Sequence, residues 1–295
     1  MQEYDYLKII NFDTVKNILP KRLPDSNKGT FGRLLCICGS KNMPGAAFYC
    51  VAAASRSGVG LIESVIPEDI YAITASKISE SLFYPISNDF EKAWDTINSL
   101  LPRATAVLVG CGMGWNKFTQ RIVYKLVRES KIPLIIDADG INVISENIDI
   151  LKEAQSDIIL TPHIKEMSRL LGEDTNYVLK NKFEVAKNFS KKYKLTLVLK
   201  DSKTVISDIN GHLYLNSTGN ESMAKGGTGD VLAGIIGSLA AQGVSALNSA
   251  IISVFIHGRS GDICKEKLSS FSVIPTDIVN NLSEVFLELD GKVIQ

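Results

Sequence analysis

The stretch Arg33-Leu34-Leu35-Cys36-Ile37-Cys38-Gly39-Ser40 starts the alternation of strand and helix that decides the fold of this chain. Residues 33–38 are short and apolar, as in a buried strand, and the loop at 39–45 contains two glycines and a proline. An alanine-rich helical stretch follows at 46–57, and Gly58 is well placed to end it. This order of strand, loop and helix is typical of α/β proteins.

Further strand signals follow along the chain, with helical segments between most of them. These short, apolar, β-branched runs lie at residues 61–66, 106–109, 132–136, 158–160 and 195–199. The alternation predicts a mainly parallel central sheet with helices on both faces. Between apolar residues at 204–216, Asn210-Gly211 is a dipeptide that favours a tight turn, so we expect a β-hairpin near 204–216.

The composition allows a single domain with a substantial core. The chain has 295 residues, 45% of them hydrophobic, and no repeat or linker-like segment divides it. We therefore expect one domain over residues 1–295, with residues 1–27 as an N-terminal lead-in. Lys plus Arg and Asp plus Glu both number 32, so no overall field favours nucleic acid or an anionic membrane. Any phosphate must be bound locally.

Cysteine usage and the first residues predict a cytoplasmic protein. The five cysteines are scattered and form no paired C-x-x-C signature, so we interpret them as reduced thiols, mostly in the core. The acidic N-terminus lacks the basic segment and the apolar run of a secretory signal. The longest apolar stretch, residues 231–241, is far shorter than the roughly 20 residues of a membrane-spanning helix.

Polar residues and glycines follow five of the predicted strands, at the point where each strand ends. Ligands of open α/β sheets gather at these carboxyl ends, which lie along one edge of the sheet. We therefore expect one large site built from the segments that follow the strands: Gly39-Ser40, residues 110–114, Asp137-Ala138-Asp139, Thr161-Pro162-His163 and Lys200.

The strongest motif is Gly226-Gly227-Thr228-Gly229-Asp230, which the helical stretch 231–241 follows directly. Glycines allow successive backbone N–H groups to turn toward one point, and a helix N-terminus adds partial positive charge, so the loop can bind a phosphoryl group. Asp230 would then lie beside the phosphate and could accept the proton of an attacking hydroxyl. The loop alone fits equally well a glycine-rich turn in which Asp230 only caps the helix.

Two familiar nucleotide-binding signatures are absent from the sequence. No G-x-x-x-x-G-K-[ST] motif of a P-loop enzyme occurs, and Gly110-Cys111-Gly112-Met113-Gly114 has the wrong spacing for the G-x-G-x-x-G motif. In isolation this segment is a strand-to-helix turn, although its glycines permit close approach of a ligand. Asp137 and Asp139 resemble a metal pair, but we favour a structural role in which they tie loops to helix N-termini.

Two further segments carry candidate ligand groups. His163 could bind a substrate, and Glu166 could hold a water bound to Mg2+ or could instead support the N-terminus of a helix that ends at Gly172. Residues 200–204 offer a lysine and hydroxyl groups to the phosphates or ribose of a nucleotide. They could equally form a solvated turn.

Taken in order, these motifs resemble those of the ADP/ATP-dependent NAD(P)H-hydrate dehydratases of the ribokinase-like superfamily. The resemblance covers nearly the whole chain and is most specific at Lys28-Gly29 and at residues 226–230. The chain departs from the family pattern at Ile164-Lys165, Asp201 and Arg259-Ser260. The other matching segments are Leu19-Pro20-Lys21-Arg22, residues 30–33, Gly39-Ser40, Gly45-Ala46-Ala47, residues 56–61, Gly112-Met113-Gly114, residues 137–140, Thr161-Pro162-His163, Lys200, Gly219-Asn220, Met223-Ala224, residues 231–234, Gln242-Gly243 and His257-Gly258.

The resemblance implies a ribokinase-like three-layer α/β/α sandwich and a hydro-lyase activity. Enzymes of this family remove water from (6S)-NADHX and (6S)-NADPHX, the damaged hydrates of NADH and NADPH, at the expense of ADP or ATP. AMP or ADP and phosphate are released with the repaired cofactor. The resemblance also implies Mg2+, a homotetramer, and a separate NAD(P)H-hydrate epimerase, because we expect no room for an epimerase domain in this chain.

The resemblance assigns residues to two ligands by position. Asp230 is the catalytic base, and the hydrate-binding positions are Ala47, Gly114, His163 and Asp230. The nucleotide-binding positions are Lys200, Asp201, Ser202, Lys203, Thr204, Asn220, Gly227, Thr228 and Gly229. Glu166 is the candidate for holding the metal through water.

Two other functions share these features. A ribokinase-like kinase of a vitamin or sugar alcohol would use the same base and anion-binding loop, and a catalytically silent nucleotide-binding protein would keep the loop without the chemistry. Residues 28–60 resemble the dehydratases more than such kinases, and the presence of Asp230 argues against a silent protein.

Overall fold

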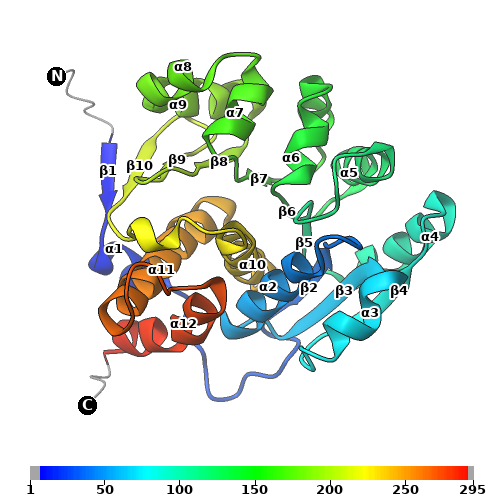
Figure 1. Ribbon diagram of the computed structural model, residues 1–295, viewed down its shortest axis with the longest axis horizontal. Helices are drawn as coiled ribbons and strands as arrows, with labels where there is room; N and C mark the ends of the chain where they lie inside the picture. The colour runs from blue at the N-terminus through cyan, green and yellow to red at the C-terminus, as the bar shows by residue number, and fades with distance from the viewer. Residues whose placement is uncertain (1–6, 292–295) are drawn as a thin grey trace.

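The computed structural model describes residues 7–291, and ten strands among them form one sheet (Figure 1). Neighbouring strands are parallel except β9, which is antiparallel to both of its neighbours. The prediction of a mainly parallel sheet is confirmed. Across the sheet the order is β1 (Leu7–Ile10), β10 (Leu213–Asn216), β9 (Val205–Ser207), β8 (Thr196–Leu199), β7 (Ile158–Leu160), β6 (Leu134–Ile136), β5 (Ala106–Val109), β2 (Arg33–Ile37), β3 (Leu61–Pro67) and β4 (Leu82–Ile86).

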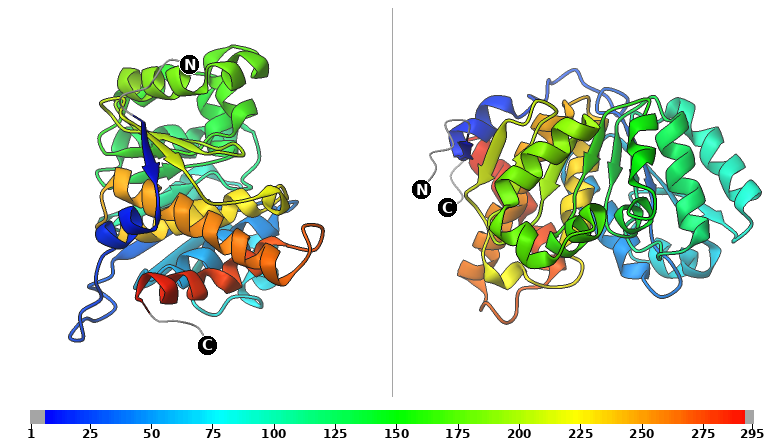
Figure 2. Two further views of the ribbon diagram at one scale, coloured as in Figure 1. Left: turned by 90° about the vertical axis from the view of Figure 1, so that its left-hand side faces the viewer. Right: turned by 90° about the horizontal axis from the view of Figure 1, so that it is seen from above.

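Helices cover both faces of the sheet and give the predicted three layers (Figure 2). Side chains alternate along each strand, so Leu34 and Cys36 of β2 enter one core and Leu35 and Ile37 enter the other. No helix in residues 7–291 is long and apolar enough to cross a bilayer. The first core lies under α1 (Phe12–Ile18), α2 (Pro44–Arg56), α3 (Glu68–Ala75), α10 (Thr228–Ala241), α11 (Ala246–Lys267) and α12 (Pro275–Leu289), and the second lies under α4 (Phe90–Leu100), α5 (Lys117–Glu129), α6 (Asp139–Ile144), α7 (Ile164–Leu171), α8 (Thr175–Lys180) and α9 (Lys182–Tyr193).

Two strands escape the sequence prediction, and both lie at the edges of the sheet. β1 and β4 are only partly buried, so their apolar residues do not form the continuous run of a central strand. β1 and α1 fall within the predicted lead-in, and β1 pairs with β10, so this segment is part of the sheet. Residues 1–6 of the lead-in lie outside the described residues.

The hairpin of β9 and β10 is confirmed, but its turn is wider than the predicted tight turn. Residues 208–212 connect the two strands. The Asp208 carboxylate accepts hydrogen bonds from the backbone N–H groups of Asn210 and His212, both at 2.9 Å. Gly211 adopts φ of +82°, which a glycine tolerates without strain. Asp208 therefore stabilises a longer loop than the dipeptide alone indicates.

Helix α10 begins in the glycine-rich loop and packs against α2 at very short distance. A Cβ atom at Gly234 of α10 would lie 2.3 Å from the carbonyl oxygen of Cys50 in α2, and backbone cannot yield as a flexible side chain can. At Gly237, in the same helix, the nearest atom to an added Cβ belongs to the Leu34 side chain at 3.1 Å. Gly234 therefore fixes the spacing of the two helices that border the site.

Substitution of Gly234 tests this packing. We expect Gly234→Ala to lower the free energy of unfolding by about 1–3 kcal/mol, because the methyl group forces α10 away from α2. Gly237→Ala is the matched control, and we expect it to be near neutral because the gain of about 1 kcal/mol in helix propensity offsets a contact that Leu34 can relieve. Urea unfolding followed by circular dichroism measures both variants. Equal stabilities would contradict the proposed close approach.

Candidate functional site

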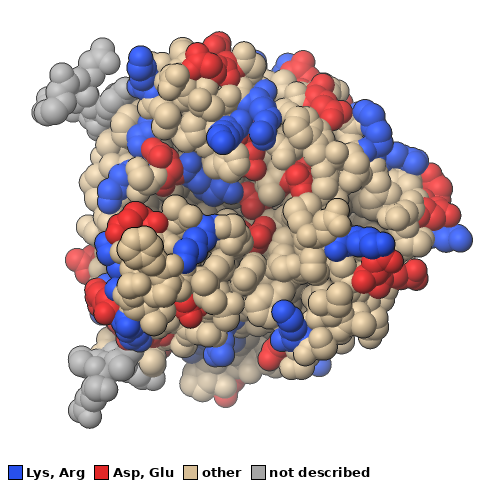
Figure 3. Space-filling model, viewed as in Figure 1, with Lys and Arg blue, Asp and Glu red and all other residues tan. Residues whose placement is uncertain are grey.

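The predicted strand ends meet at one edge of the sheet. The loops after β2, β5, β6, β7 and β8 lie there, and α10 begins among them (Figure 1). In the space-filling view the middle of the molecule is hollowed, and acidic atoms are visible inside the hollow (Figure 3). The expectation of one site along this edge agrees with this arrangement.

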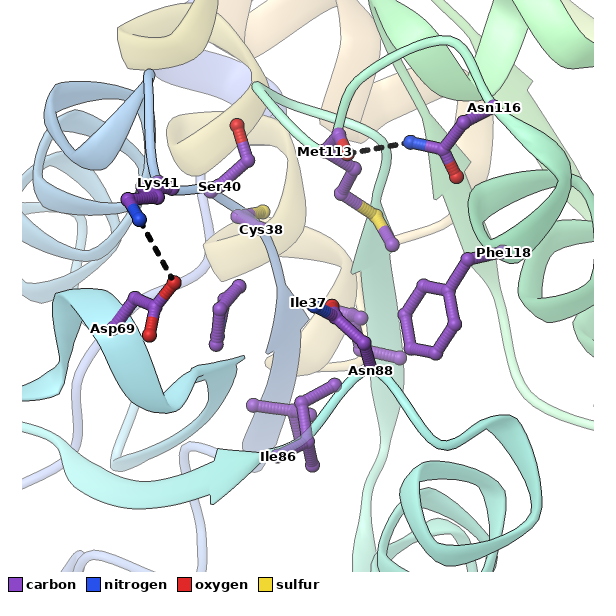
Figure 4. A pocket seen from close by; sticks show the side chains of 13 residues that line it. Ile37, Cys38, Ser40, Lys41, Asp69, Ile86, Asn88, Met113, Asn116 and Phe118 are labelled. Atoms are coloured by element: carbon purple, nitrogen blue, oxygen red, sulfur yellow. Dashed lines mark hydrogen bonds and ion pairs between the residues drawn. The ribbon is translucent and has the colours of Figure 1, made fainter.

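A cavity of about 400 Å³ opens at the carboxyl ends of β2, β3, β4 and β5 (Figure 4). Cys38, Ser40 and Lys41 line it on the side of β2, and Met113 and Asn116 line it on the side of β5. The Asn116 side chain donates a hydrogen bond to the carbonyl oxygen of Met113 at 3.4 Å. Its volume would hold part of a nucleotide-sized ligand, although Asp137, Lys200 and Asp230 do not line it.

Asp137, at the end of β6, is the electrostatic centre of the site. Its Oδ1 accepts hydrogen bonds from Lys200 Nζ at 2.7 Å and from Thr161 Oγ1 at 2.6 Å, and Cys111 Sγ lies 3.4 Å from its Oδ2. Burial alone would lower the pKa of Lys200, but the carboxylates of Asp137 and Glu166 outweigh this effect and raise it. Lys200 therefore remains a fixed positive charge.

Asp230 lies in the first turn of α10, close to this charged pair. Burial and the negative charge of Asp137 raise the pKa of Asp230 to about 7, although Lys200 and Cys111 oppose the shift. A carboxyl group with a pKa near neutrality can accept a proton at physiological pH. The residue before the helix is Gly227, which offers no side-chain cap, and Asp230 is the acidic residue of the first turn.

The glycine-rich loop presents buried polar groups without protein partners. Within residues 7–291, five buried side-chain atoms make no hydrogen bond, and two of them lie here: Thr228 Oγ1 in the loop and His257 Nε2 in the neighbouring α11. Gly227 has φ of +95°, and a Cβ there would lie 2.7 Å from the ring of Tyr49. A Cβ at Gly229 would lie 3.4 Å from Lys200 Nζ. Since buried polar groups are nearly always paired, this cradle indicates a polar ligand.

His163 and Glu166 cap the N-terminus of α7 reciprocally. The backbone N–H of His163 donates to Glu166 Oε2 at 2.8 Å, and the backbone N–H of Glu166 donates to His163 Nδ1 at 3.1 Å. α7 ends at Gly172, which is left-handed with φ of 69°, as predicted. The structural role considered for Glu166 is thus confirmed.

The surroundings shift the pKa values of the same two side chains in opposite directions. Burial lowers the pKa of His163, with help from Lys200, so its imidazole is neutral. Burial raises the pKa of Glu166 to about 7. Its second oxygen, Oε1, lies 3.4 Å from His163 Nε2. A metal role for Glu166 stays a prediction, and a divalent cation beside it would keep it ionised.

Residues 200–204 begin at the charged centre and continue into an exposed turn. Lys200 lies beside His163 in a parallel bridge and reaches Asp137. Asp201 forms an ion pair with Lys182 at 3.0 Å. Ser202 and Lys203 are exposed.

The remaining predicted positions have mixed surroundings. Ala47 is fully buried in α2, whereas Gly114 is partly exposed and donates its N–H to Asp139 Oδ2 at 2.8 Å. This bond confirms the structural role of Asp139. Thr204 Oγ1 donates to the carbonyl oxygen of Asp201 at 3.3 Å, and Asn220 Oδ1 accepts from the N–H of Ser222 at 3.0 Å. Ligand contacts at these positions stay predictions.

The fold defines a ribokinase-like α/β protein. A ribokinase-like superfamily protein from Enterococcus faecalis matches it with a TM-score of 0.85 at 25% identity, over 97% of each chain. Hydroxyethylthiazole kinase from Pyrococcus horikoshii matches it with a TM-score of 0.63 at 13% identity, over 96% of each chain, which shows the fold alone.

Residues 34–284 match the NAD(P)H-hydrate dehydratase family, and the chain belongs to this family. It is 33% identical over 255 residues to the ADP-dependent (S)-NAD(P)H-hydrate dehydratase of Neisseria meningitidis, covering 85% of this chain and 83% of that enzyme. The ADP/ATP-dependent NAD(P)H-hydrate dehydratase of Bacillus subtilis, co-crystallised with ATP/Mg2+, matches with a TM-score of 0.85 at 27% identity, over 96% of this chain and 98% of that one.

Some relatives are much longer than this chain. The bifunctional NAD(P)H-hydrate repair enzyme Nnr of Moorella thermoacetica is 31% identical over 280 residues, which cover 93% of this chain and 53% of that enzyme. The chain therefore spans about half the length of such bifunctional relatives.

Removal of the lysine tests the role of the buried pair. We expect Lys200→Met to lower the free energy of unfolding by about 3 kcal/mol, because Asp137 would be left as a buried charge without its partner. Lys203→Met, three positions away in the exposed turn, is the control, with an expected change within about 0.5 kcal/mol. Urea denaturation measures both, and a small loss in Lys200→Met would show that the pair is not a stabilising element.

Proposed function

We propose that this protein catalyses the ADP- or ATP-dependent dehydration of (6S)-NADHX and (6S)-NADPHX to NADH and NADPH. The observation that carries the proposal is Asp230, a carboxyl group with a pKa raised to about 7 at the start of α10, next to a glycine-rich loop with unpaired buried polar groups. Membership of the NAD(P)H-hydrate dehydratase family supports this choice over the kinase alternative.

The proposed reaction solves the problem of a poor leaving group. Hydroxide leaves the hydrated nicotinamide ring reluctantly, whereas phosphate leaves readily. The ring hydroxyl attacks the terminal phosphorus of the nucleotide, and Asp230 accepts its proton. The leaving group is AMP when ADP is the donor, and ADP when ATP is the donor. Cleavage of the carbon–oxygen bond next releases phosphate, and loss of a ring proton restores the double bond.

The surrounding groups stabilise the charge that moves in this reaction. The backbone N–H groups of residues 227–229 would bind the transferred phosphoryl group, and Lys200 would add a fixed positive charge near it. Neutral His163 would orient the hydrate by a hydrogen bond without competing for the proton. Mg2+ would neutralise the nucleotide phosphates, with Glu166 holding one of its waters.

The family resemblance also indicates where and with which partner the protein works. We propose a cytoplasmic homotetramer that works beside a separate NAD(P)H-hydrate epimerase, which would supply the S hydrate from the R form. The bifunctional relatives support a link between repair activities, since their name describes two functions. Light scattering of the purified protein tests the tetramer.

One assay tests the activity and the base together. We expect purified protein with enzymatically prepared NADHX, Mg2+ and ADP or ATP to restore the absorbance of NADH. Asp230→Asn should lower turnover by at least about 100-fold, the lower range for loss of a general base, while nucleotide binding stays measurable by calorimetry. If no NADH forms with either nucleotide, the dehydratase function is wrong, and near-normal activity of Asp230→Asn would remove this residue as the base.

The pH dependence gives an independent test. The base must be deprotonated, so we expect kcat/KM to rise with pH through about 7 and to fall tenfold per pH unit below it. Glu166 has a similar pKa of about 7 and could produce the same inflection. Glu166→Gln separates the two groups, because the inflection should persist in that variant. Its disappearance there would assign it to Glu166.

A further inference from the structure

Four cysteines from separate parts of the sequence converge beside Asp230. Cys36 and Cys38 lie on the face of the sheet toward α2, Cys50 lies in α2, and Cys111 lies in the loop after β5. The sulfur atoms of Cys36, Cys38 and Cys50 lie within 4.8 Å of one another. The sulfur atoms of Cys50 and Cys111 and a carboxylate oxygen of Asp230 also lie within 4.8 Å of one another.

The second group, Cys50–Cys111–Asp230, has the composition of a metal site. Two thiolates and one carboxylate are ligands that suit Zn2+ and its congener Cd2+, whereas Mg2+ prefers oxygen alone. Both sulfur atoms are fully buried, but Asp230 is only partly buried. A cation that arrives from solvent would therefore meet Asp230 first. It could keep a coordination position open on that side, as in catalytic zinc sites.

Access favours this group over the other three thiols, because it contains the partly exposed Asp230. Cys36, Cys38 and Cys50 belong to an apolar core, where three thiolates would have only the metal to compensate them. The second group adjoins Lys200, whose Nζ lies 3.4 Å from the Cβ position of Gly229, the residue before Asp230. One divalent cation and this lysine offset three of the four negative charges that the two thiolates, Asp230 and Asp137 would carry there.

We propose that Cys50, Cys111 and Asp230 form a binding site for a thiophilic divalent cation, of the Zn2+ and Cd2+ class, at the N-terminal end of α10. Each thiol loses its proton to solvent as its sulfur bonds to the metal. The carboxylate of Asp230 is then a ligand and can no longer accept a proton. Occupancy of the site therefore inhibits any reaction that uses Asp230 as its base.

Titration of the full-length protein with Cd2+ tests the site without reference to activity. Bound Cd2+ gives a thiolate-to-metal charge-transfer band in the ultraviolet, and we expect one equivalent per chain in excess Mg2+. Cys50→Ser, Cys111→Ser and Asp230→Asn should each weaken binding by at least about tenfold, the lower bound for losing a supporting group. Cys36→Ser is the matched control inside the cysteine cluster, and Cys264→Ser is the control outside it. Both should bind as the wild type does.

Several outcomes would overturn the proposal. Absence of the charge-transfer band, or unchanged binding in Cys111→Ser, excludes the site. Weak binding in Cys36→Ser together with normal binding in Asp230→Asn assigns the metal to the three core thiols instead. X-ray absorption of Cd2+ on the wild type needs no variant and should show two sulfur ligands beside oxygen. Three sulfur ligands, or oxygen alone, would contradict the assignment.

An activity measurement tests whether a bound cation inhibits the enzyme. We expect Zn2+ to inhibit the NADHX assay in excess Mg2+, and a chelator to reverse the inhibition. Cys264→Ser should be inhibited like the wild type. This arm rests on the proposed dehydratase function, whereas the Cd2+ titration does not, so failure of one is distinguishable from failure of the other. Cd2+ binding without Zn2+ inhibition would overturn the inhibitory role alone.

Discussion

The ion pair between Asp137 and Lys200 organises the site. It joins the ends of β6 and β8 across the intervening β7, whose Thr161 donates to the same carboxylate. Because both charges are withdrawn from water, their fields act on every neighbouring titratable group. Asp137 raises the pKa of Asp230, and Lys200 lowers the pKa of His163. The pair therefore helps to bring the Asp230 carboxyl near neutrality and to keep the His163 imidazole neutral.

The rigid support of this pair comes from the sheet and from α10. Strands β6, β7 and β8 are buried on both faces, which leaves their ends little freedom to move. α10 is buried along most of its length between the sheet and α2, and its apolar sides need no charged partners. The loop at its N-terminus is therefore placed by packing of the helix body, while its own backbone stays available for a ligand.

The sequence predicts the parts of this protein whose signals are local. Residues 33–57 show the strand, loop and helix because the apolar runs and glycines stand next to each other in the chain. The loop at residues 226–230 also stands out in the sequence, because its glycines and Asp230 are adjacent in the chain. β1 and β4 could not be predicted in this way, because edge strands need only one buried face and their apolar pattern is diluted. The extended turn after β9 depends on Asp208, whose carboxylate binds backbone groups two and four residues ahead.

The sequence alone does not predict which residues far apart in the chain pair with each other. The sequence indicates only a structural role for Asp137, because its bond to Lys200 depends on a strand order that periodicity does not give. The cysteines were correctly interpreted as buried thiols, and all five are buried and free. Their convergence beside Asp230 was not foreseen, because it needs the alternation of β2, the approach of α2 and the loop after β5 at once.

The position of β1 has a consequence for the order in which the chain matures on the ribosome. Leu7 pairs with Leu213, so β1 must wait for β10, the last strand among the described residues, before it gains a neighbour. Contacts of such large sequence separation form slowly, since a long segment must be ordered before they contribute stability. The strands from β2 to β8 precede β10 in the chain and can pair earlier, although α10, α11 and α12, which cover one of their faces, follow β10. β1 then adds to an existing edge, which makes its docking a late step of biogenesis.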